Sequence, residues 1–381
     1  MCRSIRGGLE EEVAMRQRLR MSKFVILLAL TLALGVAVAG CGGDDDGAAA
    51  PAEPAAEAPA EEPAAPAGDG PEQAKDTPRI VQLHPDAVAS GGWYRDGATA
   101  FNNMAEILGT EPVVLERITY DEGPATLRRL GEEGWDIIVA HSSGYEGAVL
   151  EVAPEYPDTW FLIYSDLSTT NDLPNVAGWA VNWNEVGYMA AVIACASSET
   201  GEIGMVESMP IPAMTRWGGG STQLAAEAED VVGKPCNFNV VWTGNFTDAA
   251  AAKQAGLSMI NNGSDVLFDA ADAAGAGAVE AAVQEGAKYV GGVVDQCDQA
   301  PDTVISSVIM NFDIAYEQMA ELYAAGELEP IVYPENVANE GILVTRPFCN
   351  ADPEVEAILD DVLARIGSGD IVVDPTLEIM P

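Results

Sequence analysis

From residue 79 onward, short runs of apolar and β-branched residues alternate with longer segments in which apolar residues recur at helical spacing. Most short runs lack apolar–polar alternation, which is typical of parallel strands covered on both faces. We expect strands at 80–84, 113–118, 137–140, 160–164, 177–181, 203–206, 238–242, 266–268, 289–294 and 304–308, and helices at 95–108, 125–132, 185–196, 248–261, 276–285 and 313–325. This alternation predicts an α/β fold.

The predicted strands are too many for a single open sheet of ordinary size, so we divide them between two sheets of five or six strands. The first lobe is expected to comprise 79–184 plus about 305–340, and the second 185–304 plus about 341–381. The chain then crosses between the lobes more than once. The junction of two such lobes forms a cleft, which is where open α/β sheets bind ligands.

The chain begins with features of an exported lipoprotein. Residues 24–39 form an apolar run after Lys23, but the run is shorter than the ~20 residues that span a membrane. It ends in Val-Ala-Gly-Cys at Cys41, which resembles the bacterial lipobox, whose cysteine thiol receives a diacylglycerol. We therefore expect a signal peptide region over 1–40 and lipidation of Cys41. Residues 1–20 either belong to this region or precede the true translation start.

The segment 41–78 is rich in alanine, proline and glutamate and has no periodic apolar face. Such a composition predicts a disordered tether, which proline and repelling carboxylates keep extended. The tether would lift the folded part away from the membrane that holds the lipid anchor. An acidic tail that recruits a partner is the alternative interpretation.

The charge of the chain is strongly acidic. Its 60 Asp and Glu residues outnumber 18 Lys and Arg residues, giving a formal net charge of −42 at pH 7. Such a chain repels phosphate backbones and has few cations with which to release counterions from them. We therefore exclude nucleic acid as a partner.

Four cysteines follow Cys41 in the chain, and outside the cytosol they can pair in three ways. We favour disulfides Cys195–Cys236 and Cys297–Cys349, with four free buried thiols as the alternative. No C-x-x-C spacing occurs and the chain has only 2 histidines, so we predict no metal site.

The chain lacks the motifs of common catalytic machinery, since it contains no G-x-S-x-G, Walker or H-E-x-x-H pattern. Gly275-Ala276-Gly277 follows a predicted strand and opens a helix, but Glu280 stands where a dinucleotide fingerprint needs its third glycine. We therefore predict no cofactor. His84 and His141 end apolar strands and are interpreted as structural. We predict that the protein is not an enzyme; a hydrolase on a similar scaffold is the alternative.

Several short motifs follow one another along the folded part: SGGW at 90–93, EVGYMA at 185–190, GEIG at 201–204, VWTGNFTD at 241–248, NGSDVLF at 262–268 and GVVDQ at 292–296. In order and spacing they resemble the basic membrane protein (BMP) family, lipoprotein substrate-binding components of ABC transporters related to the purine nucleoside receptor. The resemblance covers about 79–311. It implies the type I periplasmic binding protein fold, in which two Rossmann-like lobes close by a hinge on a nucleoside or related heterocycle.

The resemblance is most specific for Trp93 and Phe246, which match the two aromatic positions that sandwich the base, one from each lobe. Planar rings stacked on a purine provide affinity without charge, worth about 1–3 kcal/mol per stacked base. The alternative is that both rings belong to the core.

The resemblance also implies polar and backbone contacts to the ligand. Asp295, with Gln296 beside it, matches a carboxylate that accepts ribose hydroxyls, although helix capping or a turn would explain it too. The remaining candidates are a polar pair near the base or ribose, a segment whose backbone approaches the ligand, an aromatic residue at the cleft mouth and a residue of the first loop: Asn184 and Glu185, Gly275, Tyr145 and Ser90.

We interpret the chain as an extracytoplasmic, lipid-anchored solute-binding protein that delivers a purine nucleoside or similar planar heterocycle to an ABC permease. Few cations occur among the candidate site residues, which argues against a phosphorylated ligand. The alternatives are a lipoprotein that senses a ligand without transporting it, and a sugar-binding protein of the same fold.

Overall fold

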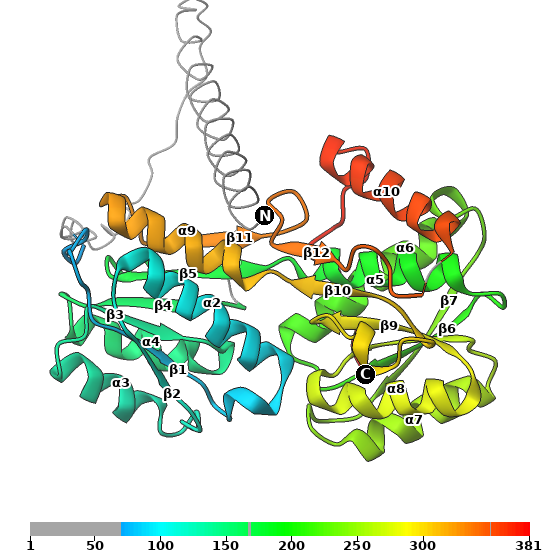
Figure 1. Ribbon diagram of the computed structural model, residues 1–381, viewed down its shortest axis with the longest axis horizontal. Helices are drawn as coiled ribbons and strands as arrows, with labels where there is room; N and C mark the ends of the chain where they lie inside the picture. Colours follow the sequence, from blue (N-terminus) through cyan, green and yellow to red (C-terminus); the bar gives the residue numbers. More distant parts are fainter. Residues whose placement is uncertain (1–69, 167–168, 351) are drawn as a thin grey trace, which may run out of the picture. The chain divides into compact units, whose positions relative to one another are not determined.

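The computed structural model describes residues 70–166, 169–350 and 352–381 (Figure 1). The expected signal peptide, Cys41 and most of the expected tether fall at 1–69, outside the described residues. Within the described ranges, every helix is too short or too polar to span a lipid bilayer.

The first lobe is built on a parallel sheet of six strands. In spatial order its strands are β11 (Val332–Glu335), β5 (Val176–Val181), β4 (Trp160–Tyr164), β3 (Ile137–Ala140), β1 (Ile80–Leu83) and β2 (Pro112–Leu115). Helices cover both faces of this sheet. Successive residues of a strand point to opposite faces, and accordingly Ile80 packs in one apolar cluster and its neighbour Val81 in another. The helices are α2 (Gly92–Leu108), α9 (Phe312–Ala325), α3 (Gly123–Glu132) and α4 (Glu146–Val152).

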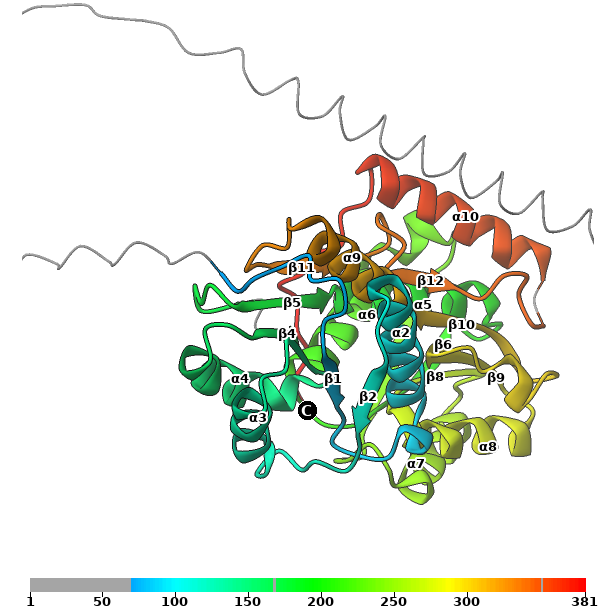
Figure 2. The same cartoon turned by 60° about the vertical axis from the view of Figure 1, so that its left-hand side comes forward.

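The second lobe repeats this plan (Figure 2). Its sheet has the order β12 (Ile342–Val344), β10 (Val304–Met310), β9 (Lys288–Val293), β8 (Val266–Ala270), β6 (Glu202–Glu207) and β7 (Asn237–Trp242). Only β12 is antiparallel to its neighbour in this sheet of described strands. The helices are α5 (Trp183–Ser197), α6 (Pro212–Val231), α7 (Ala249–Asn261), α8 (Gly275–Glu285) and α10 (Pro353–Ser368). The predicted α/β fold with two sheets is therefore confirmed.

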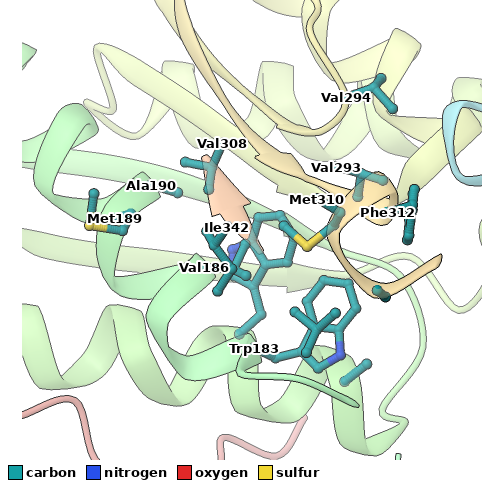
Figure 3. Packing of buried hydrophobic residues seen from close by; sticks show 14 of the residues in the cluster. Trp183, Val186, Met189, Ala190, Val293, Val294, Val308, Met310, Phe312 and Ile342 are labelled. Carbon is teal, nitrogen blue, oxygen red and sulfur yellow. The ribbon is translucent and has the colours of Figure 1, made fainter. Parts of the chain in front are cut away.

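The described chain passes between the lobes at 181–183, at 310–312 and at 335–342. The boundary between the lobes differs from the predicted one at the second crossing. The strand β10 pairs with β9, which places 304–310 in the second lobe. The helix α9 then packs on α2, so the chain joins the first lobe only from Phe312. The apolar pattern of a strand does not show which sheet it will join. Apolar side chains from the crossings and the adjoining elements, including Trp183, Met310 and Ile342, pack together (Figure 3).

The sequence pattern predicted no helix at α6, which contains three consecutive glycines at 218–220. Glycine disfavours helix formation, but it lets two helix backbones approach closely. A Cβ on Gly220 would lie 1.9 Å from the carbonyl oxygen of Asn184 in α5, and one on Gly187 of α5 would lie 1.8 Å from that of Trp217. Close packing on α5 thus explains both the glycines and the helix.

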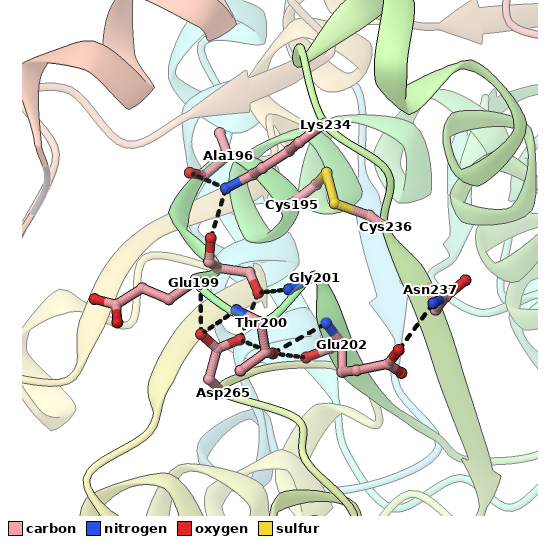
Figure 4. Close-up of a disulfide and its surroundings, with 11 residues drawn as sticks. Cys195, Ala196, Glu199, Thr200, Gly201, Glu202, Lys234, Cys236, Asn237 and Asp265 are labelled. Atoms are coloured by element: carbon pink, nitrogen blue, oxygen red, sulfur yellow. Dashed lines mark hydrogen bonds between the residues drawn. A yellow bond between two sulfur atoms is a disulfide. The ribbon is translucent and has the colours of Figure 1, made fainter.

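Two disulfides lie in the second lobe, and they are the two pairs favoured from the sequence. The Cys195–Cys236 bond joins the last turn of α5 to the segment before β7, with a Cα–Cα distance of 5.9 Å (Figure 4). Beside it, Lys234 Nζ donates a 2.5 Å hydrogen bond to the carbonyl oxygen of Ser198, at the C-terminal end of α5. The second bond joins Cys297 to Cys349.

Candidate functional site

A pocket of about 140 Å³ lies where the two lobes face each other. One water needs about 10–15 Å³ measured in this way, so the pocket has room for a small molecule. Its described lining from the first lobe and the first crossing is Trp93, Tyr94, Tyr120, Ser142, Ser143, Tyr164, Asp166 and Trp183. The second lobe provides Ile211, Ala213, Met214, Trp217, Phe246, Ala270, Asp272 and Val293.

Trp93 reaches the pocket from the first turn of α2, directly after a glycine pair. A Cβ on Gly92 would lie 2.5 Å from Val294 Cγ1 in the second lobe, so only glycine allows this close approach. The indole packs edge-on against Phe312, with ring centroids 4.8 Å apart, and against Tyr164 at 5.0 Å. These contacts hold the ring in place as a wall of the pocket.

Phe246 lines the same pocket from the loop that follows β7 in the second lobe. Its carbonyl oxygen accepts a hydrogen bond of 2.9 Å from the Ala274 N–H, which ties this loop to the segment after β8. In the same loop, Asn245 Oδ1 accepts from the backbone N–H groups of Thr247 and Asp248. The structure therefore brings the two predicted aromatic residues to one pocket from opposite lobes.

Two further indoles, which the sequence motifs did not single out, extend the aromatic wall. Trp183 stacks on Trp93, with ring centroids 6.0 Å apart and an interplanar angle of 25°, and Trp217 stacks on Trp183 at 5.8 Å and 23°. Trp183 stands at the first crossing and Trp217 lies in α6. The stack thus runs from the first lobe across the crossing into the second.

Asp166 lies at the end of a chain of hydrogen bonds in the pocket wall. Trp183 Nε1 donates to the Tyr164 hydroxyl at 2.5 Å, and that hydroxyl donates to Asp166 Oδ1 at 2.7 Å. Arg216 of α6 donates from Nη1 to the Asp166 carbonyl oxygen at 3.2 Å. Asp166 is 8% exposed, so this carboxylate forms part of a largely apolar wall.

Asp272 of the second lobe contacts the start of α2 in the first lobe, next to Trp93. Its carboxylate receives hydrogen bonds from the backbone N–H groups of Gly92 and Trp93, the unsatisfied donors at the start of α2. A Cβ on Gly91 would lie 2.7 Å from Asp272 Oδ2. Burial outweighs these hydrogen bonds and raises the pKa of Asp272 to about 6.

Asp295 and Gln296 are not among the residues that line the pocket. Asp295 is exposed, and its Oδ1 accepts a 3.0 Å hydrogen bond from the Cys297 N–H, which is a turn contact. Gln296 is buried and donates from Nε2 to the Gly292 carbonyl oxygen at 3.0 Å. Asp295 also lies within 4.8 Å of the sulfurs of Cys297 and Cys349, but these form a disulfide and are not free to bind a metal.

Asn184 and Glu185 lie in the first turn of α5, directly after the first crossing, and do not line the pocket. Glu185 Oε2 accepts a 2.7 Å hydrogen bond from the Val337 N–H of the third crossing, and burial raises the pKa of Glu185. Asn184 is fully buried and donates from Nδ2 to the Leu377 carbonyl oxygen at 2.7 Å. Both contacts link chain segments at the hinge.

The remaining three predicted site residues also lie outside the lining. Tyr145 is fully buried and donates to the carbonyl oxygen of Ile118, so the structure does not place it at the mouth of the cleft. Position after a strand did not reveal that its ring turns inward. Ser90 is exposed and donates to the Ala87 carbonyl oxygen at 2.6 Å. Gly275 is buried at the start of α8.

The two histidines lie against aromatic residues of the pocket lining, His141 beside Trp93 and His84 beside Tyr94. His141 Nδ1 shares a 2.7 Å hydrogen bond with the Tyr316 hydroxyl, and His84 Nε2 shares one of 2.8 Å with Gln82 Oε1. Burial lowers the pKa of His84 to about 4 and that of His141 well below its ordinary value. Both rings are therefore neutral at pH 7 and bring no positive charge to the pocket.

The third crossing contains a buried acid, Glu335, which is 3% exposed. Neither carboxyl oxygen has a hydrogen-bond partner among the described residues, and burial raises its pKa to about 8. A raised pKa means that its contribution to stability is complete below the unfolded pKa of about 4.5 and is lost as the pH rises through about 8.

We therefore expect that, between about pH 5.5 and pH 7, the wild type loses about 2 kcal/mol of unfolding free energy that the Glu335→Gln variant retains. Glutamine keeps the shape of the side chain but never becomes charged. Urea unfolding of both proteins at these two pH values measures the difference. Parallel pH profiles for the two proteins would contradict the assignment.

Comparisons with known proteins agree with this geometry. Residues 77–353 match the model of the Bmp family, described as ABC transporter substrate-binding protein PnrA-like. The chain is 25% identical over 286 residues to a purine-binding protein of Brucella abortus, covering 74% of this chain and 78% of that protein. It is also 25% identical over 146 residues to an ABC transporter nucleoside-binding protein of Lactococcus lactis, covering 38% of this chain and 40% of that protein.

A solved structure has the same arrangement of lobes. A solute-binding protein of an ABC transporter system from Conexibacter woesei superposes with a TM-score of 0.67 at 19% identity, covering 79% of this chain and 99% of that one.

Proposed function

The chain belongs to the Bmp family of PnrA-like ABC transporter substrate-binding proteins, and we propose that it binds a purine nucleoside or a similar planar heterocycle. Its fold is that of the type I periplasmic binding proteins. Family membership implies a small-molecule ligand and a permease partner, and a place outside the cytoplasm. The finer parts of the proposal are lipid anchoring at Cys41 and the identity of the ligand.

One observation carries the proposal: Trp93 and Phe246 line a single pocket from opposite lobes. A planar ring held by both would make contacts that the two lobes provide together only when they are closed. Such a ligand binds the closed state more tightly than the open state and shifts the population toward it. The purine-binding and nucleoside-binding relatives support a purine as the planar group.

Calorimetric titration of the protein with purine nucleosides, free purine bases and monosaccharides tests the proposal. We expect saturable binding of a nucleoside or a free base. The sugars should show no binding at the same concentrations. Sugar binding alone would overturn the purine assignment and leave a sugar-binding protein of the same fold. Mass spectrometry of the small molecules that co-purify with the protein is an independent check.

We further propose that the protein performs no catalysis and that its role is delivery to a permease. The prediction is that a bound nucleoside is recovered unchanged after prolonged incubation, as measured by chromatography. Recovery of a free base and ribose would instead support a hydrolase.

A further inference from the structure

The pocket contains acidic side chains but, among its described lining residues, no lysine, arginine or histidine. The acids are Asp166 and Asp272, one from each lobe. Their environments differ, because Asp272 already receives the N–H groups of Gly92 and Trp93 at the start of α2. Asp272 is therefore occupied in holding the lobes together, and Asp166 is the carboxylate left to consider as a ligand contact.

The direction of each hydrogen bond at Asp166 is fixed by its neighbours. An indole N–H can only donate, so the Tyr164 oxygen accepts from Trp183 Nε1 and its own hydrogen is directed to Asp166 Oδ1. This bond uses one of about four acceptor positions on the carboxylate. The chain of bonds also holds the carboxylate in one orientation in the pocket wall.

Arg216 contacts Asp166 at the backbone and not at the carboxylate. Arg216 donates to the backbone carbonyl oxygen of Asp166, and its Nε lies 3.4 Å from Glu378 Oε1. A carboxylate repels an acceptor atom of the ligand that is placed against it, whereas a donor placed there makes a hydrogen bond to a charged group. A molecule that touches this carboxylate therefore binds best when it presents a hydrogen-bond donor to it.

We propose that Asp166 determines specificity in this pocket by selecting ligands that present neutral N–H or O–H donors to its carboxylate. The inference rests on the proposed function, since it concerns the same pocket. In a purine nucleoside these donors come either from an amino group on the base or from the two ribose hydroxyls. Ligands that offer only acceptors or a phosphate at this place are rejected.

Three probes distinguish the two sources of donors: adenosine, purine riboside, which lacks the amino group, and 2′,3′-dideoxyadenosine, which lacks both hydroxyls. We expect the wild type to bind adenosine about 10- to 100-fold more tightly than one of the two analogues, as for a hydrogen bond to a charged group. The analogue that binds weakly identifies the donor. In Asp166→Asn this preference is expected to fall to within a few-fold, because the amide presents both a donor and an acceptor.

Two further variants complete the experiment. Calorimetry measures the affinity of every protein for the three probes. Tyr164→Phe keeps the carboxylate but removes the hydroxyl that orients it, so it should reduce the same preference less than Asp166→Asn does. Asp298→Asn removes an exposed carboxylate outside the pocket lining and should retain the wild-type preference. Melting temperatures show that each variant is folded.

The possible results separate this inference from the function on which it rests. Equal wild-type affinity for all three probes, or an unchanged preference in Asp166→Asn, overturns the role of Asp166 and leaves nucleoside binding in place. If the wild type binds none of the probes, the proposed purine nucleoside and this inference both fail.

Discussion

Replacing both Trp93 and Phe246 by alanine is expected to weaken binding of a purine nucleoside more than any single substitution in the pocket. Loss of one stacked ring costs about 1–3 kcal/mol, or roughly 5- to 150-fold in affinity. The two rings come from different lobes but would contact the same ligand, so we expect the double variant to lose more affinity than either single variant without the two losses being strictly additive. Calorimetry of the two single variants and the double variant measures each contribution.

The matched control is Trp135→Ala. This indole lies away from the pocket, where the Arg79 guanidinium covers its ring at 4.4 Å. Its removal should leave nucleoside affinity unchanged. Wild-type affinity in both Trp93→Ala and Phe246→Ala would contradict the role assigned to the aromatic wall.

The second large effect is expected from the double variant Cys195→Ala, Cys236→Ala. The two cysteines are 41 residues apart, and both are buried in the second lobe. The chain-entropy estimate for a loop of this length gives a loss of about 4 kcal/mol in unfolding free energy. Denaturant unfolding of the wild type and the variant, without reductant, measures the loss.

Adding a reductant provides the control for this pair. Reduction should destabilise the wild type by opening both disulfides, whereas in the variant it can act only on Cys297–Cys349. Equal unfolding free energies of the wild type and the variant without reductant would show that the Cys195–Cys236 bond does not stabilise the protein.

Much of the fold could be predicted from the sequence, because its information is local. Strands such as 137–140 and 160–164 are continuous apolar runs, and parallel strands covered on both faces require such runs. The helix α6 could not be predicted, since its glycines at 218–220 serve a contact with α5 that only the folded chain creates. The assignment of 304–310 to a lobe depends on strand pairing, which apolar periodicity does not encode.

In the candidate site, too, residues in local sequence motifs could be predicted and residues that depend on distant partners could not. Trp93 and Phe246 were singled out because they stand in motifs, and both reach the pocket. Trp183, Asp166 and Asp272 were missed because their roles depend on partners distant in sequence, such as the start of α2 for Asp272. Asp295, by contrast, stands in a motif but bonds to its own turn.

The central claim is that a planar heterocycle binds between side chains of the two lobes. A crystal structure of the protein grown with a saturating purine nucleoside tests it most directly. We predict electron density for the base between the rings of Trp93 and Phe246, with Asp166 within hydrogen-bond distance of the ligand. A nucleoside bound elsewhere on the molecule, with this pocket empty, would contradict the claim.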